Sequence, residues 1–237
     1  MKSLQCLFVL AVAVFASACT SVSTFKVDAI SAPQQIVGRS YRLIPANPET
    51  SPKDLRFMEA ERYVRTALAA QGYTPVQGEQ GADMVITLDV AIGEPENVTR
   101  TRPTPIYAEE GGYYRVARVR VTDRDGNASY VRTTVWSPPY MRVIGSVDSA
   151  YTETLYEKRM ALTAFAGSST DGEDLPQLWS VVVLARDTNG DLRSILPQMA
   201  LAAATYAGKD TSGQVEYSVK ADAPELLYVR GETTSAQ

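Results

Sequence analysis

Ser23 and Lys26 have the Ser-x-x-Lys spacing of a serine nucleophile that forms an acyl-enzyme beside a lysine. That chemistry needs the serine at the start of a buried helix, and it needs Ser-Asp-Asn and Lys-Thr-Gly elements across the pocket. Neither partner motif occurs, and the nearest, Lys209-Asp210-Thr211, has the wrong order. The sequence instead indicates a leash or edge strand here and predicts no catalytic residue.

Asp123, Asp125 and Asn127 have the oxygen spacing that opens a calcium-binding loop. Such a loop continues with a glycine and ends in a bidentate glutamate, but Ala128 and Thr134 occupy those positions. A hairpin turn explains the same residues, because Asp-Gly and Asn suit tight turns between strands. We therefore predict no metal site.

Histidine is absent from the whole chain. This excludes Ser-His-Asp and Cys-His catalysis, histidine-ligated zinc and general acid–base chemistry by imidazole. Carboxylate chemistry, a Ser–Lys pair and an oxygen-ligated cation remain open. From these observations we predict a protein that is not an enzyme and holds no cofactor.

The N-terminus has the features of an export signal. An apolar run over residues 4–15 follows one positive charge and is too short to span a bilayer as a mature helix. Small residues precede Cys19 in a pattern that resembles the bacterial lipobox, although Ala16 stands where leucine is usual. We predict a lipoprotein signal peptide at 1–18 and a lipidated Cys19; plain secretion with a leftover cysteine is the alternative.

Lipidation also fits the cysteine count. Cys6 leaves with the signal, so Cys19 is the only cysteine of the mature chain and no internal disulfide forms. Two or three acyl chains anchor a protein stably, at about 0.8 kcal/mol per buried methylene. Thr20 rather than Asp follows the cysteine, which in Gram-negative lipoproteins favours transfer to the outer membrane. We expect residues 19–22 to be a leash that holds the protein on the periplasmic face of that membrane.

The composition is that of a folded globular chain, with 45% hydrophobic and 21% charged residues. The net charge of −4 and the absence of a basic run predict no nucleic-acid partner and no polybasic patch for anionic lipid. The length suits a single domain over residues 23–231, followed by a disordered tail at 232–237.

Apolar periodicity predicts two amphipathic helices. The first covers 52–71 with Ser51 as its N-cap, and the second pattern covers 192–206, where Ser194 as N-cap leaves Pro197 in the first turn. The expected strands are 23–30, 39–45, 82–92, 113–122, 129–136, 151–165, 177–186 and 214–219. The three prolines and two glycines of residues 94–112 predict a loop or an irregular edge.

Four aromatic residues are the candidate partner surface. Trp136 and Tyr140 flank a Ser-Pro-Pro turn after a hairpin strand, and Tyr113 and Tyr114 follow an acidic, glycine-containing loop. Packing of these residues or solvation of the loop is the alternative. Trp179 lies in an apolar strand, and we expect it in the core.

Several segments together resemble the DUF4136-type bacterial lipoproteins, over roughly residues 25–219. They are the lipobox-like start, Ser40-Tyr41-Arg42-Leu43, Gln71-Gly72-Tyr73, Ala82-Asp83-Met84-Val85-Ile86 and the late DLRSILPQMALAAATY segment. The resemblance implies an α+β fold, a mainly antiparallel sheet with two amphipathic helices packed on one face, and no catalytic residues. The chain departs from the family over about 113–175, which is either a set of extended hairpins or an insertion.

The function predicted from the sequence is that of a lipid-anchored envelope protein, a non-enzymatic interaction or structural module with an envelope protein as partner. A free sheet edge that accepts a strand gives it a mechanism without a catalytic residue. Two alternatives stay open: a periplasmic small-ligand binder, which needs a closed apolar pocket lined by tyrosine, and a carboxylate-based periplasmic hydrolase, which needs two acidic residues close together in a cleft.

Overall fold

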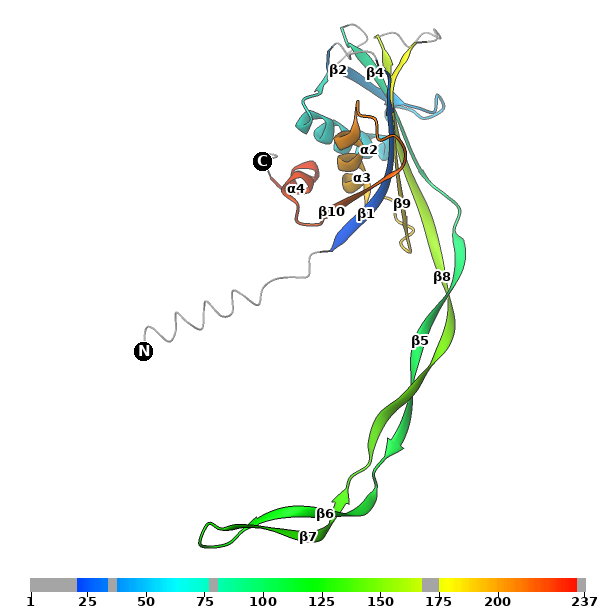
Figure 1. The fold of residues 1–237 in the computed structure, drawn as a ribbon. Helices are drawn as coiled ribbons and strands as arrows, with labels where there is room; N and C mark the ends of the chain where they lie inside the picture. The colour runs from blue at the N-terminus through cyan, green and yellow to red at the C-terminus, as the bar shows by residue number, and fades with distance from the viewer. Residues whose placement is uncertain (1–20, 34–37, 77–80, 168–174, 234–237) are drawn as a thin grey trace, which may run out of the picture. The chain divides into compact units, whose positions relative to one another are not determined.

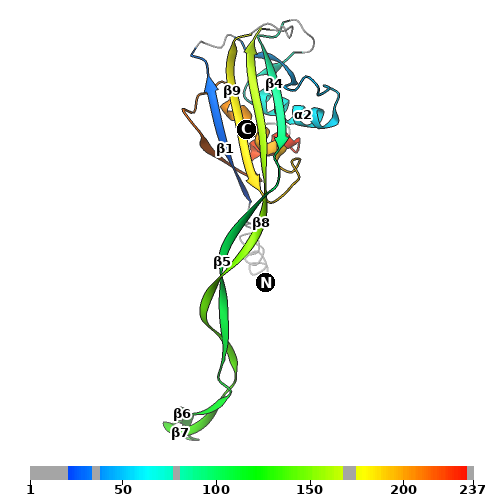
Figure 2. The same ribbon diagram turned by 90° about the vertical axis from the view of Figure 1, so that its right-hand side faces the viewer.

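The computed structural model describes residues 21–33, 38–76, 81–167 and 175–233. The chain divides into two compact units, drawn in Figures 1 and 2: the core unit, residues 1–96 and 154–237, and the ribbon unit, residues 97–153. The predicted signal peptide, residues 1–18, and the predicted lipidation site, Cys19, lie outside the described residues. Within the described part of the chain, no helix is both long and apolar enough to cross a membrane.

A mixed β-sheet forms the core unit. In chain order its strands are β1 (Val22–Ser31), β2 (Ser40–Pro45), β3 (Thr74–Pro75), β4 (Met84–Ile92), β8 (Tyr140–Ala166), β9 (Gln177–Asp187) and β10 (Val215–Lys220). Their order across the sheet is β10-β1-β9-β8-β4-β2-β3. Neighbours from β10 to β4 are antiparallel, whereas β2 runs parallel to both β4 and β3.

The predicted fold class is therefore wrong. The described residues are mostly β, with 54% of them in strands and 17% in helices, and the sheet is mixed rather than mainly antiparallel. Three short helices, instead of two, lie in the described part of the chain: α2 (Leu55–Ala70), α3 (Leu196–Tyr206) and α4 (Pro224–Arg230). Helix α2 and strand β3 lie between β2 and β4 in the chain, and the parallel pairing of β2 with β4 depends on such a crossover connection.

The core lies between the sheet and the helices (Figure 1). In β1, Phe25, Val27 and Ala29 are buried, and the residues between them are exposed, as the period of two along a strand requires. Trp179 of β9 is 1% exposed, which confirms that it belongs to the core. Helix α3 is buried at nearly every position, and its small alanines allow this close approach.

The helix starts differ from the prediction. Asp54, not Ser51, is the N-cap of α2, because its carboxylate accepts hydrogen bonds from the backbone N–H groups of Arg56 (2.8 Å) and Phe57 (3.2 Å). The N-cap position of α3 is Ile195 rather than Ser194. Pro197 does lie in the first turn of α3, where its missing N–H leaves no bond unmade.

For residues 94–112 the sequence predicts a loop or an irregular edge. The predicted loop is wrong, because most of the segment forms strand β5 (Glu96–Glu110), which pairs with β8. Pro103 and Pro105 lie inside this strand. Residues two apart direct their N–H groups to the same edge of a strand, so the two prolines remove donors from one edge only.

Strands β6 (Tyr113–Thr122) and β7 (Ala128–Ser137) form the predicted hairpin, which is confirmed. Asp123 closes its turn: one carboxylate oxygen accepts from the backbone N–H groups of Asp125 (3.0 Å) and Asn127 (2.8 Å). Gly126 has a φ of 84°, a conformation that glycine adopts without strain. The calcium-like spacing of these residues is therefore used to close a turn.

Candidate functional site

The Ser-x-x-Lys spacing does not assemble a nucleophile. Ser23 and Lys26 lie in β1, where residues three apart point to opposite faces of the strand. In a helix the same spacing would place the two side chains side by side. The motif is therefore part of a strand pattern.

All four aromatic residues predicted as a partner surface lie in the ribbon unit and are exposed. Tyr114 and Trp136 are opposite each other in the β6–β7 register, and their ring centroids lie 4.9 Å apart. Tyr113 pairs with Ser137, so it lies on the other face of the hairpin from Tyr114. Of the four residues, Tyr114 and Trp136 are therefore in ring contact, while Tyr113 lies close enough to Tyr140 to contribute to its raised pKa.

Tyr140 belongs to a polar cluster with Glu110 and Arg142. The Arg142 guanidinium lies 3.0 Å from a Glu110 carboxylate oxygen, and the Tyr140 hydroxyl donates to the same carboxylate. The bonds from Arg142 and then Tyr140 lower the pKa of Glu110, and the bond to Glu110 raises the pKa of Tyr140. The Tyr140 hydroxyl is thus committed to a contact within the ribbon unit.

Gly111 and Gly112 separate β5 from β6 and lie opposite the Pro138-Pro139 pair that separates β7 from β8. A Cβ added to Gly111 would lie 2.3 Å from the Pro138 carbonyl oxygen, and its φ of 98° is strained for other residues. Only glycine therefore fits at this junction.

The β6–β7 hairpin has two chemically different faces. The arginine face consists of Tyr114, Val116, Arg118, Arg120, Thr122, Ala128, Tyr130, Arg132, Thr134 and Trp136. The valine face consists of Tyr113, Arg115, Ala117, Val119, Val121, Ser129, Val131, Thr133, Val135 and Ser137. Large apolar side chains are exposed on both faces, with Val116 72% and Val131 48% exposed.

Both outer edges of the hairpin are open within the described residues, because β6 and β7 pair only with each other. Each strand is ten residues long and contains no proline, whereas β5 contains two. Proline blunts a sheet edge because it lacks a backbone N–H donor. The hairpin therefore presents two open edges with complete rows of backbone N–H groups for strand addition.

The ribbon unit is also the basic part of the chain. Residues 97–153 contain eight arginines and six carboxylates, whereas the whole chain has a net charge of −4. These arginines form no continuous basic run in the sequence, because other residues separate them. Strand alternation and the hairpin register bring Arg118, Arg120 and Arg132 onto one face.

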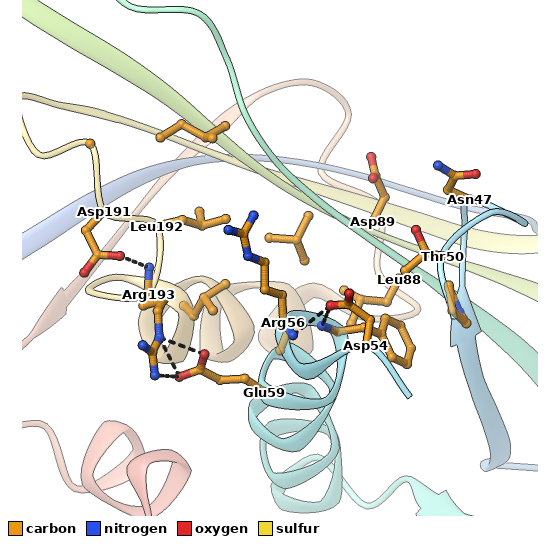
Figure 3. A pocket seen from close by; sticks show the side chains of 17 residues that line it. Asn47, Thr50, Asp54, Arg56, Glu59, Leu88, Asp89, Asp191, Leu192 and Arg193 are labelled. Atoms are coloured by element: carbon orange, nitrogen blue, oxygen red, sulfur yellow. Dashed lines mark hydrogen bonds and ion pairs between the residues drawn. The ribbon is translucent and has the colours of Figure 1, made fainter. Parts of the chain in front are cut away.

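A cleft of about 580 Å³ lies in the core unit (Figure 3). Arg56 projects into it. Its carboxylates have structural partners: Asp54 caps α2, Glu59 binds Arg193 at 2.8 Å, and Asp191 accepts from the Arg193 backbone N–H at 3.0 Å. Its described lining contains no tyrosine. The cleft is therefore not the tyrosine-lined apolar pocket that a small-ligand binder needs. These three carboxylates are bound to other groups, so they do not form the free acidic pair that a carboxylate-based hydrolase needs.

Asp89, the fourth carboxylate of the cleft, forms an ion pair with Arg159. Elsewhere in the core unit, Lys158 is fully buried and its ammonium lies 2.9 Å from the Asp187 carboxylate. No group of three or more Cys, Asp or Glu residues placed to hold a metal ion occurs among the described residues. These charges serve as contacts between neighbouring strands.

Comparison with known proteins finds solved structures that are similar to this chain but no family to which it belongs. No protein-family model and no curated protein matches the chain. A PDZ domain protein from Parabacteroides distasonis is similar at 10% identity and a TM-score of 0.41, over 89% of this chain and 42% of that protein. A PelC dodecamer from Paraburkholderia phytofirmans is similar at 14% identity and a TM-score of 0.35, over 78% and 98% of the respective chains. Similarities this low define no class for the protein, and the DUF4136 resemblance stays a prediction.

Proposed function

We propose that this protein is a non-enzymatic interaction module of the cell envelope, lipid-anchored at Cys19 on the periplasmic face of the outer membrane. Its partner-binding part is the ribbon unit. The observation that carries the proposal is the β6–β7 sheet, which has two open edges without proline and exposed apolar side chains within the described structure.

Strand addition is the mechanism. A two-stranded hairpin is marginally stable in water, and each added strand satisfies a row of backbone N–H and C=O groups. Tyr114 and Trp136 supply an exposed aromatic pair beside the backbone contacts. Aromatic side chains of this kind dominate the affinity of many interfaces. The partner is therefore an envelope protein that offers an extended segment.

Site-specific photo-crosslinking in the native envelope tests the proposal. A crosslinker in place of Val119 or Tyr130 should capture the same envelope protein, and excess untagged wild-type chain should compete it away. The matched control is a crosslinker in place of Lys26, which is exposed on β1 of the core unit. An identical capture pattern from the ribbon and control positions would contradict the proposal.

The anchor is tested separately by mass spectrometry of the mature N-terminus. The expected species begins at Cys19 and carries a diacylglycerol on sulfur. The Cys19→Ser variant should leave the membrane fraction when cells are fractionated at high salt. An unmodified Cys19 in the wild-type protein would rule out lipidation while leaving the ribbon proposal intact.

A further inference from the structure

Three arginines form a compact basic cluster on the arginine face. Arg118 and Arg120 are two residues apart on β6, and Arg132 is directly opposite Arg118 on β7. Cβ atoms of opposite residues lie about 5 Å apart, and like charges in such a pair destabilise the sheet. No ion pair or cation–π contact within the described hairpin offsets this repulsion.

Three other arginines of the ribbon unit, Arg100, Arg102 and Arg142, have partners that offset their charge. Arg100 lies 2.9 Å from a Glu153 oxygen, Arg142 pairs with Glu110, and the Arg102 guanidinium lies 5.6 Å from the centre of the Tyr151 ring. In contrast, the three arginines of the cluster make no ion pair and no cation–π contact among the described residues. Their charge is therefore available to an external anion.

The valine face of the hairpin favours a lipid surface over a soluble polyanion as the source of the anion. Val119, Val121 and Val131 are exposed on the valine face, and Arg115 is its only charged residue. A soluble polyanion would cover the arginines and leave these valines in water. At a lipid surface, apolar side chains enter the acyl boundary while arginines reach phosphates, so both faces are accommodated.

We propose that the β6–β7 hairpin lies on an anionic phospholipid surface, with the valine face toward the acyl chains and Arg118, Arg120 and Arg132 extended to lipid phosphates. The aromatic pair of Tyr114 and Trp136 fits this position, since both residue types are enriched at membrane interfaces. This goes beyond the proposed function, because it uses the faces of the hairpin and leaves its edges open to a partner strand.

Charge distinguishes this occupant from a second hairpin of the same protein. Residues 113–137 contain five arginines and two aspartates, so two hairpins brought face to face would repel each other. Anionic phospholipid attracts the same charges, at roughly fivefold in partitioning per arginine near the surface. The cluster therefore favours lipid over self-association.

Vesicle sedimentation of the mature chain with Cys19→Ser tests the inference without an acyl anchor. The protein should bind vesicles that contain phosphatidylglycerol and phosphatidylcholine, bind weakly to phosphatidylcholine alone, and dissociate as salt is raised. The triple variant Arg118→Gln, Arg120→Gln, Arg132→Gln should bind the anionic vesicles on the order of 100-fold more weakly.

The matched control is the triple variant Arg100→Gln, Arg102→Gln, Arg142→Gln, which removes the same charge from arginines that have partners in the ribbon unit. Its binding should fall much less than that of the cluster variant. Equal losses in the two variants, or equal binding to neutral and anionic vesicles, would overturn the inference. Sedimentation of the Cys19→Ser chain without vesicles would show self-association and would also overturn it.

Trp136 provides a second readout. The chain has two tryptophans, and only Trp136 is exposed, so the emission of Trp136 should shift to the blue on anionic vesicles while Trp179 stays unchanged. The shift should disappear in the Trp136→Phe variant. Photo-crosslinking to an envelope protein without vesicle binding would leave the proposed function standing and reject this inference alone.

Discussion

The core unit and the ribbon unit use the same strand pattern in opposite ways. In β1 the apolar residues Phe25, Val27 and Ala29 are at most 2% exposed, because they belong to the core that the sheet forms with its helices. In β6, Val119 and Val121 lie on the valine face without comparable cover and are 38% and 46% exposed. Alternation therefore marks which face of a strand is apolar, and a second element or a second molecule has to cover it.

The two tryptophans should show the largest difference in stability between the core unit and the ribbon unit. Trp179→Ala should lower the free energy of unfolding by about 3–5 kcal/mol, because a large side chain in contact with Tyr73 is removed from a closed core. Trp136→Ala should change it by less than about 1 kcal/mol, since this ring is 47% exposed. Urea unfolding followed by circular dichroism measures both. Similar losses would mean that the ribbon is packed as tightly as the core.

Ion pairs give the second test. Asp187→Ala should destabilise the core unit by about 3 kcal/mol, because Lys158 is fully buried and loses its counter-charge. Glu110→Gln breaks the pair with Arg142 in the ribbon unit, where both groups are exposed, and should leave the free energy of unfolding unchanged within error. Both variants are compared at low and high salt, and the loss in Asp187→Ala should persist at high salt because salt screens a buried charge little.

The core unit was largely predictable because its signals are local. Helix α2 shows a period of three and four at Phe57, Ala60 and Val64, and β9 is a continuous apolar run around Trp179. The caps were less predictable: Ser51 and Asp54 are both good N-cap residues, and the helix begins after the one whose carboxylate reaches two N–H groups.

The fold class and the candidate surface could not be derived in the same way. The direction of β2 relative to β4 depends on the crossover through α2, which periodicity does not report. Prolines in β5 resemble loop residues, although strands at a sheet edge tolerate proline. The arginine cluster requires the β6–β7 register, since Arg118 and Arg132 are fourteen positions apart in the sequence.

Tyr41 allows a test by pH within the core. Burial raises the pKa of its hydroxyl to about 12, and that oxygen has no hydrogen-bond partner among the described residues. A raised pKa contributes stability that is complete below the ordinary value of 10.0 and is lost as the pH rises toward 12. Wild type should therefore lose about 2 kcal/mol more than Tyr41→Phe over this range. Parallel losses in the two proteins would contradict the burial argument.

The smallest expected effect concerns the one aromatic contact of the ribbon surface. Tyr114 and Trp136 touch across the hairpin, so a double-mutant cycle with alanine should give a coupling energy of about 0.5–1 kcal/mol. Hydrogen exchange of β6 and β7 amides is the measurement, because it reports local opening of the hairpin.

Tyr114 and Tyr130 are the control pair, on the same face without a ring contact among the described aromatic pairs, and their coupling should be near zero. On anionic vesicles the Tyr114–Trp136 coupling should grow, because lipid would cover both rings and slow the opening that exchange detects. Coupling that is the same with and without lipid would mean that the aromatic pair serves the hairpin alone. The surface would then bind its partner through the open strand edges.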